Sequence, residues 1–235
     1  MTASPENDEK PRRAGHEGHR ARLRARFMTA GPDSLADHEL IELLMFAALP
    51  RRDTKPIAHD LLARFKTFSG ILAASPADLM KTKGVGEAAA TAIKAAQATA
   101  LRLMRSEIVG RPVISSWKQV LDYCKASMAE ERVEQFRILF LDRQNQLIGD
   151  EVQQKGTVDH TPVYPREVVK RALDLGATAI VLVHNHPTGD TQPSRADIDM
   201  TRAISQAAAP LGIAIHDHIV IGRRGHSSFK ALGLL

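Results

Sequence analysis

The sequence has almost no cysteine, since Cys124 is the one cysteine among 235 residues. A single thiol excludes a disulfide framework and any zinc module that is built on several cysteines. Aromatic residues make up only 4% of the chain, which argues against a surface on which single-stranded nucleic acid stacks its bases. No apolar run approaches the roughly 18–20 residues needed to cross a membrane. The first residues lack the apolar core of a signal peptide, so we expect a cytoplasmic protein with no membrane partner.

The charge and the histidine content are more informative than the absences. The chain has 32 lysines and arginines against 27 acidic residues, which gives a net charge of +5. A charge of this size suits a polyanionic partner but does not require one, because it is spread over a large surface. Hydrophobic residues make up 43% of the chain, enough for a buried core. Histidine is the informative residue, since six of the ten histidines lie between His160 and His226.

The composition divides the chain into four parts. Residues 1–22 are polar and have no apolar period, which predicts a disordered basic tail. Residues 23–106 carry only helical patterns and predict a small all-α domain. Gly, Arg and Pro within residues 107–112 indicate a linker. Residues 113–235 alternate helix and strand patterns, so we predict a second domain of the mixed α/β or α+β class. Its expected strands lie at residues 136–141, 147–154, 178–183 and 213–221.

Two histidines follow the most apolar of these strands. His184 and His186 are two residues apart on an extended segment, so their side chains point to the same side. Ser194 and Asp197 lie where the next helix is expected to begin, and a carboxylate in the first turn of that helix can fold back as a third ligand. Two imidazoles and one carboxylate, with a fourth position open to water, are typical of a catalytic zinc site, whereas a structural site is closed.

Each part of this pattern also has a plainer interpretation. Ser194 and Asp197 by themselves favour a helix capping box. A histidine pair at the end of a strand is more often polar loop chemistry, and residues 187–190 are typical of a tight turn. The joint pattern favours the zinc site, because a buried strand delivers both histidines to its exposed end, where α/β proteins place their sites.

The spacing His-x-His, seven residues, Ser, two residues, Asp resembles the signature of the JAB/MPN (JAMM) zinc metalloproteases. The longer string from His184 to Gly189, with Asp217-His218-Ile219 downstream, resembles the bacterial RadC family. The resemblance implies an MPN domain of cytidine-deaminase-like fold behind a helical N-terminal domain, and it covers nearly the whole chain after the tail. Asn185 stands between the histidines, where the eukaryotic peptidases carry Ser or Thr, and is typical of the RadC branch.

The resemblance also implies roles for individual residues. His184, His186 and Asp197 would hold one Zn²⁺ per chain, and Ser194 would help to hold the oxyanion as the scissile carbonyl becomes tetrahedral. The family uses an upstream glutamate that takes a proton from water and passes it to the leaving amine, and Glu151 is our candidate for this base.

The choice of Glu151 has alternatives. A glutamate on a strand usually belongs to a solvated face, and Asp150 and Glu167 compete with it for the role of the base. Downstream, His216 and His218 flank Asp217 on the last long strand, so we expect the two histidines to share one face. We favour a structural role there, or one in which Asp217 or His218 orients a ligand imidazole.

The helical part contains a weaker signal. Lys83, Gly84 and Gly86 lie between two expected helices and resemble a helix-hairpin-helix, in which glycines let backbone N–H groups approach a DNA phosphate. Such contacts are independent of base sequence and sensitive to salt. The plainer interpretation is that two helices turn tightly against each other. Non-specific DNA binding through residues 23–106 is therefore one partner hypothesis.

Three functions follow from these patterns. The first is a zinc-dependent hydrolase of peptide or isopeptide bonds, with a peptide or protein as its substrate. The second is a DNA-associated accessory protein in DNA repair or genome maintenance, whose MPN domain binds metal without turning over peptides. The third, a metal-dependent nuclease, is weaker because one His₂Asp site lacks the second metal that many nucleases use to clamp a phosphate. The substrate and the oligomeric state stay open.

Overall fold

The computed structural model describes residues 15–113, 115–156 and 163–235. The chain forms two compact units that divide between Ala96 and Gln97. The division falls within the long helix α6 (Glu87–Ile108), whereas the linker was predicted at residues 107–112. Each unit is described by itself below.

The described residues of the first unit form helices joined by turns and contain no strand, as the sequence predicts. Thr67 and Ser75 begin two of its helices, because their hydroxyls accept hydrogen bonds from the backbone N–H groups of Gly70 and Asp78. An apolar core built on Ile41, Leu61, Leu79 and Ile93 holds the helices together. The elements are α1 (Gly15–Ala30), the 3₁₀ turn η1 (Pro32–Ser34), α2 (Asp37–Met45), α3 (Lys55–Phe65), α4 (Phe68–Ala73), α5 (Pro76–Met80) and the first part of α6.

Helix α1 corrects the predicted tail. Residues 15–22 belong to this helix, while residues 1–14 lie outside the described residues. Arg20 is only 8% exposed, and its guanidinium donates hydrogen bonds to the carbonyl groups of Phe46, Leu49, Pro50 and Arg52. It also stacks on the Phe46 ring. An arginine therefore anchors the helix where apolar periodicity gives no signal.

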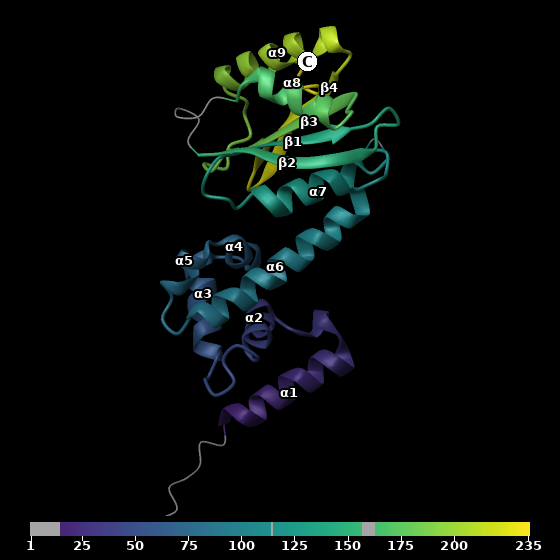
Figure 1. Cartoon of the computed structure of the whole chain (residues 1–235). Helices are drawn as coiled ribbons and strands as arrows, with labels where there is room; N and C mark the ends of the chain where they lie inside the picture. Colours follow the sequence, from purple (N-terminus) through teal and green to yellow (C-terminus); the bar gives the residue numbers. More distant parts are fainter. Residues whose placement is uncertain (1–14, 114, 157–162) are drawn as a thin grey trace, which may run out of the picture. The chain divides into compact units, whose positions relative to one another are not determined.

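The second unit is a five-stranded sheet of order β2-β1-β3-β4-β5 with helices on both faces (Figure 1). Helix α7 covers one face, and α8 and α9 cover the other. Only the β3–β4 pair is parallel among the paired strands of the described chain. The elements are α7 (Trp117–Met128), β1 (Gln135–Leu141), β2 (Leu147–Lys155), α8 (Pro165–Asp174), β3 (Ala179–Asn185), α9 (Arg195–Ala208), the 3₁₀ turn η2 (Ala209–Leu211), β4 (Ala214–Gly222) and β5 (Gly225–Ser228).

The central strands are apolar on both faces because both faces are covered. Every residue of β3 is buried. On β1, Ile138 packs toward α8 and α9, while Leu139 packs toward α7. This alternation is the period-two pattern of a strand that is buried on both sides. The predicted fold class, a helical region followed by an α/β domain, is confirmed.

The predicted linker is part of the second unit. Helix α6 extends to Ile108, which is fully buried in the core of this unit. Val109 and Pro112 then form isolated bridges with Leu147 and Gln146 at the start of β2. The segment with the Gly-Arg-Pro composition therefore lies against the start of β2.

Within the described ranges, we find no helix that combines the length and the apolar character needed to span a bilayer. The cytoplasmic location stays a prediction.

Candidate metal centre

Four potential metal ligands meet where β3 ends. His184 is near the end of this strand, His186 follows it, and Asp197 lies in the first turn of α9. Strand β1 runs antiparallel to β3 and pairs Phe136 with His184, so Glu134, just before β1, arrives at the same edge. One ligand atom from each of these four residues lies within 4.8 Å of all the others.

The donor atoms lie close enough together to share one metal ion. The Nε2 atoms of His184 and His186 are 2.9 Å apart. The Asp197 carboxylate places Oδ1 3.4 Å from Nε2 of His184 and Oδ2 3.5 Å from Nε2 of His186. Bonds of about 2.0–2.1 Å in a tetrahedral zinc site put the donor atoms roughly 3.3 Å apart. The three residues that the sequence predicts as ligands therefore come together with their donor atoms 2.9–3.5 Å apart, close to the spacing within a shared metal site.

A hydrogen bond at Nδ1 of His186 determines which ring nitrogen carries the hydrogen. Its Nδ1 lies 3.0 Å from the backbone oxygen of Asp190. A carbonyl oxygen only accepts, so Nδ1 must carry the hydrogen and donate. In a neutral imidazole, Nε2 then keeps its lone pair, which is the form that binds metal.

A longer chain of hydrogen bonds determines which ring nitrogen of His184 carries the hydrogen. The Thr201 hydroxyl donates to the backbone oxygen of Asp197 at 2.6 Å, so its oxygen must accept from Nδ1 of His218, also at 2.6 Å. Nε2 of His218 is then an acceptor, and it lies 2.7 Å from Nδ1 of His184. Because His184 donates through Nδ1, its Nε2 lone pair faces the cluster.

The capping box and the metal site use the same residues. Ser194 caps α9, with its Oγ accepting from the backbone N–H of Asp197 at 3.2 Å. The Ser194 backbone N–H donates to Oδ2 of Asp197 at 2.7 Å. These two bonds fix the carboxylate that faces the histidines. The two interpretations of Ser194 and Asp197 are therefore compatible.

The electrostatics of the cluster follow from burial and mutual contact. Burial by itself would raise the pKa of Asp197, but its contacts with His184, His186 and Ser194 outweigh it and hold that pKa well below its usual range. Burial raises the pKa of Glu134, against the attraction of the two imidazoles. Burial lowers the pKa of His218, which agrees with its neutral state in the hydrogen-bond chain.

Glu151 does not join the cluster, which corrects the predicted base. Its carboxylate forms an ion pair with the Arg171 guanidinium of α8, with Oε1 2.5 Å from Nη2. The alternatives are engaged elsewhere as well: Asp150 pairs with Arg137, and Glu167 pairs with Arg166. The carboxylate that the structure brings to the histidines is Glu134.

A signal for Glu134 exists in the sequence, but it depends on strand pairing. Glu134 lies two residues before the predicted strand at residues 136–141. Antiparallel pairing of that strand with the histidine strand puts its beginning beside the end of the other. The pairing joins residues about 50 positions apart, so it could not be derived from local pattern.

His216 and His218 do not share the same surroundings, contrary to the prediction, because β4 contains a bulge. The register with β3 shifts between the pairs Ile180–Ile215 and Val181–Asp217, which leaves His216 as the extra residue. His218 contacts His184, whereas Nε2 of His216 lies 2.6 Å from Oδ1 of Asn145. Of the two residues proposed to orient a ligand, His218 is the one in contact.

Asp217 has a structural role instead. Its carboxylate accepts hydrogen bonds from the Ser228 hydroxyl and from the backbone N–H of Lys230. These bonds join β4 to the turn near the end of the chain.

The predicted phosphate-binding turn in the first unit lies directly before α6. Lys83 and Gly86 are exposed, and a side chain at Gly86 would meet nothing within 4 Å. Gly84 has a φ of +91°, a conformation that favours glycine, and packs against Ile57. Both the tight-turn interpretation and the phosphate interpretation agree with this geometry.

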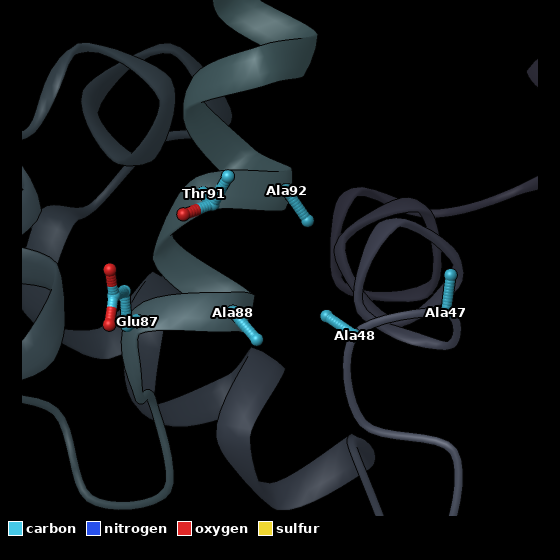
Figure 2. A pocket seen from close by; sticks show the side chains of 6 residues that line it. All are labelled: Ala47, Ala48, Glu87, Ala88, Thr91 and Ala92. Atoms are coloured by element: carbon cyan, nitrogen blue, oxygen red, sulfur yellow. The ribbon is translucent and has the colours of Figure 1, made fainter.

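The same end of α6 also lines an open groove (Figure 2). Figure 2 shows side chains of α6 facing those of the turn after α2 across this space. The lining consists mostly of small side chains and offers one carboxylate: Ala47, Ala48, Glu87, Ala88, Thr91 and Ala92. None of these lining residues belongs to the candidate metal centre, so the groove is a separate feature.

Two family models match the chain. The RadC-like JAB domain matches residues 114–234, just over half of the chain. The UPF0758 N-terminal model matches residues 18–91, the helical part. The four clustered ligands and the sheet that carries them lie within the first match. By this match the chain belongs to the RadC family, with a JAB domain preceded by a helical N-terminal region.

Proposed function

We propose that this protein is a zinc-dependent hydrolase of peptide or isopeptide bonds. The observation that supports this function is the cluster of Glu134, His184, His186 and Asp197 at one sheet edge. When bound there, Zn²⁺ supplies a Lewis acid that polarises the scissile carbonyl and lowers the pKa of water. His184, His186 and Asp197 hold the ion, and Glu134 remains for proton transfer.

Glu134 is the general base of this proposal. Its carboxylate takes a proton from the attacking water and passes it to the leaving nitrogen. Burial raises the pKa of Glu134, and a general base works best when its pKa approaches the working pH. The base and the ligands are within reach of the same reacting atoms, because their ligand atoms lie within 4.8 Å of one another.

Ser194 supports the oxyanion in this proposal. Its Oγ accepts from the Asp197 backbone through a lone pair, so that bond does not use the hydroxyl hydrogen. The hydrogen can be donated to the oxygen of a tetrahedral carbonyl adduct. Because Ser194 also caps α9, its replacement affects both the cap and the chemistry.

The test is a screen of peptides and isopeptide-linked conjugates with the zinc-loaded full chain. Glu134→Gln should lower kcat by at least about 100-fold while zinc stays bound. Glu151→Gln is the matched control, because it makes the same chemical change at a carboxylate that pairs with Arg171, and it should keep the wild-type rate. Hydrolysis that survives Glu134→Gln, or an equal loss in both variants, would overturn the proposal.

A second candidate is a DNA-associated role in genome maintenance. The observation that favours it is the exposed turn with Lys83 and Gly86 at the start of the 22-residue helix α6. A helix N-terminus with an exposed glycine and a lysine suits a phosphate group.

This candidate predicts weak DNA binding that depends on salt and not on zinc. Full-chain affinity for duplex DNA should fall steeply with rising salt, survive His186→Ala, and weaken in Lys83→Glu. Lys118→Glu is the matched control, because Lys118 is an exposed lysine of the second unit. Equal binding by all these variants would reject the turn as the contact.

A further inference from the structure

Asn185 lies between the two histidines of the metal centre but faces the other way. Successive side chains of an extended strand point to opposite faces of the sheet. Only 1% of Asn185 is exposed, and a buried amide needs partners for both its oxygen and its nitrogen. Those partners are all in the segment that carries Glu134.

The amide contacts three backbone groups of residues 131–135. Its Oδ1 accepts a hydrogen bond from the backbone N–H of Gln135 at 2.8 Å. Its Nδ2 donates toward the backbone oxygens of Val133 at 3.3 Å and Glu131 at 3.4 Å. The orientation of the amide is fixed by these partners, because an N–H only donates and a carbonyl oxygen only accepts.

These contacts hold the peptide groups on both sides of Glu134. The Val133 oxygen belongs to the peptide group that precedes Glu134, and the Gln135 N–H belongs to the one that follows it. The backbone oxygen of Glu134 also accepts a hydrogen bond from Gly156 at 3.1 Å. With both flanking peptide groups fixed, the direction in which the Glu134 side chain leaves the backbone is fixed too.

The strand ladder does not provide this control by itself. Strand β1 begins at Gln135, so residues 131–134 lie before it. A single hydroxyl at position 185 has only one hydrogen to donate, whereas the amide of Asn185 donates two and accepts as well. The chemistry of an asparagine therefore matches the three groups that it contacts.

We propose that Asn185 is the positioning residue of Glu134, and that it couples the strand of the zinc-binding histidines to the segment of the general base. The inference rests on the proposed role of Glu134. Without the Asn185 amide, the Glu134 carboxylate leaves the cluster, while His184, His186 and Asp197 keep their own partners.

The first test measures hydrogen exchange at the Gln135 amide in the full chain. In Asn185→Ala this amide should exchange at least roughly tenfold faster than in the wild type, because it loses a buried acceptor. Asn145→Ala is the matched control, since it removes an asparagine whose amide contacts His216. Unchanged exchange at Gln135 in Asn185→Ala would overturn the proposal.

The second test is a double-mutant cycle on zinc affinity, measured with zinc alone by competition with a chromophoric chelator. Asn185→Ala should weaken zinc binding roughly tenfold in the wild-type background, the lower end of what outer partners of a metal site contribute. The reason is that the Glu134 carboxylate, which is not one of the three ligands but adds a negative charge within 4.8 Å of them, leaves the cluster. In the Glu134→Gln background the same change should cost less than about twofold, because Asn185 acts through Glu134. An equal loss in both backgrounds, or no loss in the wild type, would overturn the proposal.

The two tests separate this inference from the proposed function. Asn185→Ser, a milder change, should give an intermediate rate at Gln135, so the test stands even where Asn185→Ala does not fold. If the wild-type chain binds no zinc, the proposed function fails, and the exchange rate at Gln135 alone decides the role of Asn185. If zinc binds and the cycle is non-additive but no peptide is cleaved, the positioning role stands and the hydrolase does not.

Discussion

At the residue scale, the candidate metal centre depends on side chains that lie outside the cluster of possible ligands. Nδ1 of His184 donates a hydrogen bond to His218, and His218 donates one to the hydroxyl of Thr201. The Thr201 hydroxyl in turn donates to the backbone oxygen of Asp197 in α9. His218 is fully buried, with no exposed surface. An N–H that loses its acceptor there stays unsatisfied, and the tautomer of His184 is no longer fixed.

We therefore expect Thr201→Val to weaken zinc binding roughly tenfold, because valine accepts no hydrogen bond from Nδ1 of His218. Thr201→Ser keeps the hydroxyl and should bind zinc within about twofold of the wild type. Competition with a chromophoric chelator measures both affinities. Equal affinities in the Val and Ser variants would contradict the hydrogen-bond chain.

A pH series tests the structural role of Glu151. The side-chain hydrogen bond from Arg171 lowers the pKa of Glu151 below its ordinary value of 4.5. A lowered pKa in the folded state contributes stability above the ordinary pKa, and this stability is lost as the pH falls through the folded value. Glu151→Gln should thus lower the melting temperature slightly at pH 7, and the difference from the wild type should vanish in acid. A difference that grows in acid would reject this role.

Sequence pattern predicted the two histidines and the aspartate of the candidate metal centre, but not its glutamate. His184 and His186 are two residues apart, and Asp197 opens the next helix, so their meeting requires only local geometry. Glu134 requires the antiparallel pairing of β1 with β3, which is a tertiary fact. The resemblance calls for an upstream glutamate without giving its place in the fold, and Glu151 was therefore predicted instead.

At the scale of elements, the end of β4 shapes the loop that carries His186. A Cβ added at Gly222 would lie 2.5 Å from the backbone oxygen of Gly189 and 2.7 Å from Cγ2 of Thr191. The backbone N–H of His186 also donates to Ile221 of this strand at 3.0 Å. The loop packs so closely that only glycine fits at position 222.

Gly222→Ala should therefore displace the loop, with a loss of about 1–3 kcal/mol in the free energy of unfolding and weaker zinc binding. Gly225→Ala, in the next strand, is the matched control, because a Cβ there meets nothing within 4 Å. Denaturant unfolding and chelator competition measure the two effects. Wild-type behaviour of Gly222→Ala would mean that the loop is not held by β4.

Two elements show what periodicity cannot predict. Helix α1 is anchored by the guanidinium of Arg20 on backbone carbonyls, so an apolar stripe is not needed for its first half. The bulge at His216 shifts the faces of β4 by one residue, so alternation along the sequence misplaces that histidine. In both cases the local structure depends on a particular hydrogen bond or backbone irregularity, which the spacing of apolar residues does not indicate.

At the scale of the whole molecule, the chain is two compact units, and the candidate metal centre lies in the second. The helical and α/β character of the two parts was predictable, because the hydrophobic period changes from 3.6 to 2 between them. The point of division was not predictable, since α6 carries helical pattern without interruption across it.

Zinc should stabilise the second unit selectively. Trp117 is the one tryptophan of the chain and packs, partly buried, against the core of that unit, so its fluorescence reports on this unit. At 100 times the dissociation constant, zinc should add about 2.7 kcal/mol and raise the Trp117 transition by on the order of 10 °C. His186→Ala should abolish the shift, and its persistence in that variant would locate the zinc elsewhere.

The most direct measurement is the amount of zinc bound per chain in the purified wild type and in His186→Ala, after both have been supplied with zinc and desalted. The account predicts about one zinc per wild-type chain, as for a single His₂Asp site, and almost none in the variant. A wild-type chain without zinc, or a variant that retains it, would contradict the metal centre.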